Sequence, residues 1–203
     1  MTDVAAAPIA VHPAGAAPPR PEFSIVPVRA IPAVVIVLAG LVAAIASNRL
    51  WALDFYHVVG GGMWTGVDLF VGFVVGPIIG RMPIPARVEF STRFMPKMLL
   101  LMPTLVTMTL ASGWQLARHV GNLQAGSAAH PWVLASYIVV AVMAVIAIGV
   151  LEPANLAVLF ELKKPRPDGE LIAKLMRRFV YTAGITGAMQ VATLVIMTRL
   201  ATL

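Results

Sequence analysis

Cysteine is absent from this chain of 203 residues, and charged residues make up only 12% of it. Without cysteine the chain can form neither a disulfide framework nor a thiol nucleophile. Average soluble proteins carry roughly 25% charged residues, whereas this chain is 59% hydrophobic and has a mean hydropathy of +0.87. The sequence also lacks the HExxH, GxSxG and phosphate-loop motifs of soluble enzymes. Because a soluble domain of this size could not bury so much apolar surface, we predict a protein embedded in a membrane.

Long runs without charge define the expected architecture. Four runs contain no charged residue, and a fifth is interrupted only by Asp68. They match the roughly 20 apolar residues of a membrane-spanning helix and greatly exceed a barrel strand of about 10. We therefore predict an all-α membrane bundle with a four-helix core and one additional N-terminal helix. The five predicted spans lie near residues 31–48, 54–80, 97–118, 132–160 and 178–199.

The N-terminal residues differ from the rest of the chain. The first 28 residues contain seven Ala and six Pro, and proline interrupts both helices and central strands. Residues 1–29 are therefore predicted to form a Pro/Ala-rich cytoplasmic tail, either without regular structure or held by other membrane subunits. Residues 30–203 are predicted to form the transmembrane helical domain.

Basic residues are divided unequally between the two sides that five spans define. Of the 15 Lys and Arg residues, 12 fall on the side of the N-terminus and 3 on the other. By the positive-inside rule, the N-terminus is cytoplasmic and the C-terminus lies outside. We attribute the pI of 10.3 to this topology and to anionic lipid. No nucleic-acid partner is expected, because no basic patch interleaved with aromatic residues lies outside the spans.

Two consecutive predicted spans carry polar residues with the same spacing. Steps of 4, 3 and 4 residues separate the members of each set, so each set lies on one face of its helix. The sets are His57, Gly61, Trp64 and Asp68 in one span, and Met108, Ser112, Gln115 and His119 in the next.

These faces suggest a cofactor site. If the hairpin is centred within the charged segment 81–97, His57 and His119 lie at nearly the same height. Two neutral imidazoles at one level can ligate a haem iron from both sides, and Gly60–Gly62 would leave room for the macrocycle. We therefore predict haem b with His57 and His119 as iron ligands. The other residues predicted to surround it are Gly61, Trp64, Ser112 and Gln115.

Asp68 is expected near the middle of its span, about 16 Å from His57 along the helix. No Lys or Arg lies at that depth in any predicted span. Two interpretations stay open: a proton or ion relay, or a neutral carboxyl that is hydrogen-bonded to Thr65, Gln190 or a hydroxyl group.

Other candidate residues carry weaker signals. Glu152, which precedes Pro153, is expected near the membrane interface. His12 and His130 are not expected to be ligands, because the first lies in the tail and the second in a loop. A stripe of methionines could bind Cu(I), but methionine commonly fills gaps between helices, so copper is not favoured. The stripe consists of Met95, Met98 and Met102.

Residues 55–117 contain two recognisable motifs. The first, in FYHVVGGGMWTGVDLFVGFVVGP, is a His followed by Trp-x-Gly, here His57, Trp64 and Gly66. The second begins with the Arg93-Phe94 pair and ends with Ser-Gly-Trp at 112–114. Together they resemble small bacterial integral membrane proteins of the CopD and HemJ type.

This resemblance implies a four-helix core in the bacterial cytoplasmic membrane. HemJ-type members bind haem and oxidise protoporphyrinogen, and CopD-type members are linked to copper uptake. The resemblance would assign the functional histidine to His57 and the functional basic residue to Lys97 or Arg93. Asp68 departs from the family pattern, since apolar residues are usual at that position.

Three functions stay open from the sequence, and it does not decide whether the chain is an enzyme. The first is a b-type haem protein in electron transfer or an oxidoreductase complex. The second is a non-catalytic structural subunit of a larger membrane complex. The third is copper or proton transport through Asp68 and the methionine stripe.

Overall fold

The computed structural model describes residues 24–203, and this part of the chain is helical with no strand. Residues 1–23, which include His12 and most of the predicted tail, lie outside the described residues. The elements in chain order are η1 (Val28–Ala30), α1 (Ile31–Ser47), α2 (Leu50–Leu69), η2 (Phe70–Val75), α3 (Gly76–Arg81), α4 (Ile84–His119), α5 (His130–Ile146), η3 (Ala147–Leu151), α6 (Glu152–Lys163) and α7 (Gly169–Leu200).

Five helices are long and apolar enough to cross a membrane, which confirms the predicted multi-pass bundle. Two of them contain an element between two α-helices: α2, η2 and α3 form one continuous span, and α5, η3 and α6 form another. The elements η2 and η3 are π-helical segments. Such segments are rare in proteins and are frequently found at functional sites.

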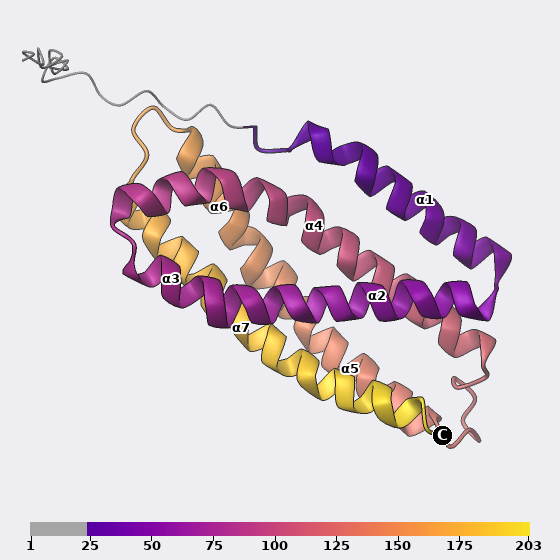
Figure 1. Cartoon of the computed structure of the whole chain (residues 1–203). Helices are drawn as coiled ribbons and strands as arrows, with labels where there is room; N and C mark the ends of the chain where they lie inside the picture. The colour runs from indigo at the N-terminus through magenta and orange to yellow at the C-terminus, as the bar shows by residue number, and fades with distance from the viewer. Residues whose placement is uncertain (1–23) are drawn as a thin grey trace, which may run out of the picture.

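The four core spans form two antiparallel hairpins, and α1 packs outside them against α4 and α2 (Figure 1). Only 11% of the most apolar stretch of the span Val28–Ser47 is buried inside the bundle. This low burial agrees with the prediction of an additional helix outside the four-helix core. The α3–α4 and α6–α7 connections lie at one end of the bundle, which we call the basic end (Figure 1). The α1–α2 and α4–α5 connections and the C-terminus lie at the opposite end.

The α4 helix begins 13 residues earlier than the predicted start at residue 97. The turn before it is tight, because the Arg87 side chain donates hydrogen bonds to the carbonyl groups of Met82 and Gly80, each at 2.8 Å. The prediction treated the charged segment 81–97 as a connection between spans. The structure instead carries most of this segment on α4, because charged residues are compatible with a helix.

Glycines bring α7 close to the span that contains Asp68. A Cβ atom on Gly72 would clash with the backbone of Gly184, and one on Gly187 would lie 3.0 Å from the backbone nitrogen of Leu69. Close helix packing through small residues is common in membranes. The close approach allows the side chains of α7 to reach the buried face of α2.

Candidate functional site

His57 is anchored on α4. Its Nδ1 lies 2.9 Å from the carbonyl oxygen of Thr109, and a Cβ atom on Gly113 would lie 2.6 Å from the imidazole ring. Because a carbonyl oxygen only accepts hydrogen bonds, Nδ1 carries the proton and Nε2 is the free ring nitrogen. The missing side chain at Gly113 therefore makes room for the imidazole of His57 itself.

His119 does not lie opposite His57. It is the exposed last residue of α4, and it follows Gly113 by six residues, which is about 9 Å along the helix. The prediction of equal height is wrong because the hairpin turns at residues 82–83 rather than near residue 89. The structure does not bring the two imidazoles together, so a haem iron ligated by both residues does not fit this arrangement.

Three further predicted cofactor residues have packing roles. Gly61 faces the side chain of Thr109. Ser112 donates hydrogen bonds to carbonyl groups of its own helix. Gln115 donates to Asn48 at 2.8 Å, and Asn48 has the left-handed backbone conformation, with φ of 48°, that closes the α1–α2 corner.

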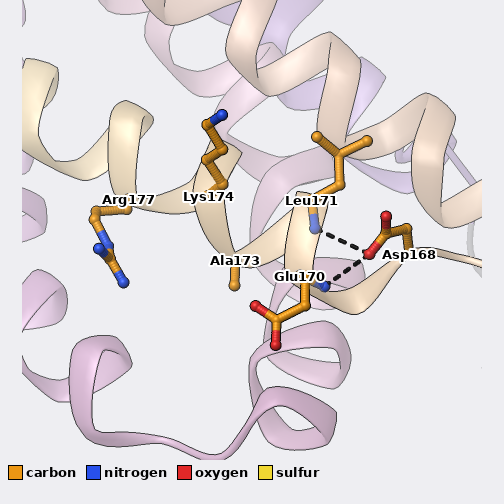
Figure 2. Close-up of a pocket in the computed structure, with 6 residues that line it drawn as sticks. All are labelled: Asp168, Glu170, Leu171, Ala173, Lys174 and Arg177. Atoms are coloured by element: carbon orange, nitrogen blue, oxygen red, sulfur yellow. Dashed lines mark hydrogen bonds between the residues drawn. The ribbon is translucent and has the colours of Figure 1, made fainter.

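The basic residues that the resemblance points to lie on the surface. Arg93 forms an exposed ion pair of 2.7 Å with Glu89, and Lys97 is exposed. A surface pocket at the start of α7 is lined by charged residues of both signs (Figure 2). There Asp168 accepts hydrogen bonds from the backbone nitrogens of Glu170 and Leu171, as an N-cap residue does.

Asp68 lies at the centre of a hydrogen-bonded group between α2 and α7. Its Oδ2 accepts hydrogen bonds from Thr186 Oγ1 at 3.2 Å and from Gln190 Nε2 at 2.7 Å, and Trp64 also donates to the carboxyl group. The sequence predicted Gln190 as a partner, and the hydroxyl group is that of Thr186. Thr65 instead donates to the carbonyl group of Gly61. Within residues 24–203, Asp68 forms no ion pair.

A cavity of about 300 Å³ opens beside this group and is lined by all four core spans. Its oxygen-bearing side chains include Asp68, Glu152 and Asn155. Most of the remaining wall is apolar, aromatic or thioether-containing, and no Lys, Arg or His is among the described residues that line it.

Glu152 lies within the long apolar helix His130–Lys163, and its predicted position near the membrane interface stays a prediction. It precedes the end of α6 by 11 residues, or roughly 16 Å, and Asp68 precedes the end of α3 by 13 residues, or roughly 20 Å. The two carboxyl groups therefore have similar depths. Each also adjoins a π-helical segment, since η2 begins two residues after Asp68 and η3 ends just before Glu152.

Asn155 was not among the predicted site residues. It is only 1% exposed, it lines the cavity, and its Oδ1 is buried with no hydrogen-bond partner among the described residues. The Oε1 atom of Gln190 is likewise buried without a hydrogen-bond partner among the described residues. The signal in the sequence was an amide three residues after Glu152, which returns to nearly the same helix face.

No protein-family model, no curated protein and no solved structure matches this chain. The resemblance to proteins of the CopD and HemJ type therefore stays a prediction.

Proposed function

We propose that this membrane protein binds and transfers protons within the bilayer, with Asp68 as the proton acceptor and Glu152 as its partner. One observation carries this proposal: two carboxyl groups from different spans line one cavity that has no basic residue among its described lining residues. Ionisable residues at membrane depth commonly mark proton or ion pathways.

The surroundings of Asp68 favour reversible protonation. An ionised carboxylate without a cationic partner is costly in a low-dielectric interior. Three donors offset this cost, because Thr186, Gln190 and Trp64 all direct hydrogen bonds to the carboxyl group. The apolar surroundings therefore favour the neutral carboxyl group and the donors favour the ionised one, and a proton relay requires such a balance.

Water can connect the two carboxyl groups. A buried water needs about 10–15 Å³ of cavity volume and two to four polar partners, so a cavity of about 300 Å³ holds several. The unpartnered Oδ1 of Asn155 is a suitable acceptor for one of them. A chain of such waters would carry a proton between Asp68 and Glu152.

Infrared difference spectroscopy of the reconstituted protein tests the proposal. Acidification should produce a carboxylic-acid stretching band that disappears in Asp68→Asn. The matched control is Asp54→Asn, which changes the same residue type at an exposed position of the same helix and should leave the band in place. Proton uptake that is identical in wild type and Asp68→Asn would refute the proposal.

A haem protein is the second candidate, with His57 as an axial ligand. The hydrogen bond from His57 Nδ1 to the Thr109 carbonyl is of the kind that orients metal-bound histidines. It leaves Nε2 free to ligate iron. An absorption spectrum of the purified protein without a Soret band would exclude this candidate.

A further inference from the structure

The cavity wall combines two kinds of surface. Small-molecule sites are mostly apolar and contain a few well-placed polar groups. Here Asp68, Glu152 and Asn155 supply the polar groups, and Met98, Met102 and Met143 supply much of the apolar surface. The polar groups are two carboxyls and a buried amide oxygen without a partner. These groups favour a ligand that is positively charged or donates hydrogen bonds.

The shape and chemistry of the cavity select among such ligands. Anions are disfavoured by two carboxyl groups without a basic neighbour. A bare metal ion would fill only a small part of about 300 Å³ and would leave the apolar wall without contacts. A small organic cation uses both surfaces, since its charge lies near the carboxyl groups and its hydrocarbon part against the wall.

Aromatic and thioether groups strengthen this match. Trp64 and Phe179 both line the cavity, and the face of an aromatic ring attracts organic cations, most strongly for Trp. Methionine side chains are flexible and polarisable, so they adapt to ligands of different shape.

The cavity also has a lateral mouth toward the lipid. Three of its lining residues are exposed on the surface of the bundle: Pro103 and Thr107 on α4, and Ile148 on η3. Ile148 is 73% exposed. A lipophilic cation that partitions into the bilayer could therefore reach Asp68 from within the membrane.

From these observations we infer that the cavity is a binding site for a small lipophilic organic cation, such as a protonated amine or a quaternary ammonium ion. Its positive charge lies beside Asp68, and Glu152 and Asn155 complete the polar side of the site. The inference rests on the proposed function in one respect: a proton on Asp68 and the cation exclude each other.

Trp64 provides a direct readout of binding. Trp51, Trp114 and Trp132 are exposed, so their replacement by Phe leaves Trp64 as the single tryptophan. This variant, in lipid nanodiscs, is titrated with benzyltrimethylammonium chloride and, in parallel, with its neutral isostere neopentylbenzene. We expect saturable quenching by the cation, and at least tenfold weaker binding in Asp68→Asn. Asn155→Leu should weaken binding in the same direction without changing a charge, whereas Asp54→Asn should not alter it.

Three results would overturn the inference: no binding of the cation, equal binding of the neutral isostere, or equal affinity in wild type, Asp68→Asn and Asn155→Leu. A pH series separates this inference from the proposed function. If binding is saturable and depends on Asp68 but does not weaken on acidification, the proton site fails and the cation site stands. If the infrared band depends on Asp68 and no cation binds, the proton site stands and the cation site fails.

Discussion

Gln190 and Asp68 are 122 residues apart in the sequence, yet Gln190 Nε2 donates a hydrogen bond to Asp68 Oδ2 at 2.7 Å. The bond joins α7 to α2 at the depth where Gly187 packs on the backbone of Leu69. It therefore depends on the close approach of the two helices. Disturbing either the bond or the approach should affect both stability and the candidate site.

Replacing Gln190 by Leu is expected to lower the free energy of unfolding in detergent by about 1.5–3 kcal/mol, because it removes a hydrogen bond to a buried carboxyl group. The control is Thr198→Val on the same helix, where the hydroxyl group bonds only to its own helix at an exposed position. In an Asp68→Asn background the cost of Gln190→Leu should become smaller. Equal costs in both backgrounds would show that the two residues are not coupled.

Gly72 and Gly66 provide a matched pair of glycines on one span. A Cβ atom on Gly72 meets the backbone of Gly184, whereas one on Gly66 meets nothing within 4 Å. Gly72→Ala should therefore destabilise the bundle by about 1–3 kcal/mol through overpacking, and Gly66→Ala should be neutral or slightly stabilising. Thermal unfolding of the two variants in the same detergent measures the difference. Equal unfolding temperatures would contradict the close α2–α7 approach.

The spans were predictable because apolar runs report directly on burial in lipid. The N-terminal helix was expected at 31–48 and is Ile31–Ser47, and the next span was expected at 54–80 and extends over residues 50–81. The start of α4 was predicted too late because charge was equated with a loop. Charged residues do not end a helix once it has left the apolar region.

The late predicted start of α4 also led to a wrong prediction of which residues lie beside His57. The height of His57 relative to His119 depends on where the hairpin turns, and the turn at 82–83 places Thr109 and Gly113 beside His57 instead. The placement of Asp68 and Glu152 in the wall of one cavity was not predictable for another reason. It depends on how the two hairpins pack, and the sequence contains no local signal for that packing.

His57 and His119 should behave very differently on substitution. His57→Ala removes a hydrogen bond to α4 and the ring that fills the space at Gly113, so we expect a loss of about 1–2 kcal/mol of stability. His119→Ala should change stability by less than about 0.5 kcal/mol, because the residue is exposed. The haem-to-protein ratio of the same variants tests the second candidate function. Any bound haem should be lost in His57→Ala and retained in His119→Ala. The opposite pattern would contradict the placement of both residues.

The absence of cysteine makes the topology directly testable. Single cysteines at Asn122 and Arg166 place one thiol in each of two connections at opposite ends of the bundle. The excess of basic residues at the end that contains Arg166 predicts that this end is cytoplasmic. A membrane-impermeant maleimide should therefore label Asn122→Cys in intact cells and label Arg166→Cys only after the membrane is opened. Labelling of Arg166→Cys alone in intact cells would show the opposite orientation. Labelling of both positions in intact cells would contradict a single membrane span, formed by α5, η3 and α6, between Asn122 and Arg166.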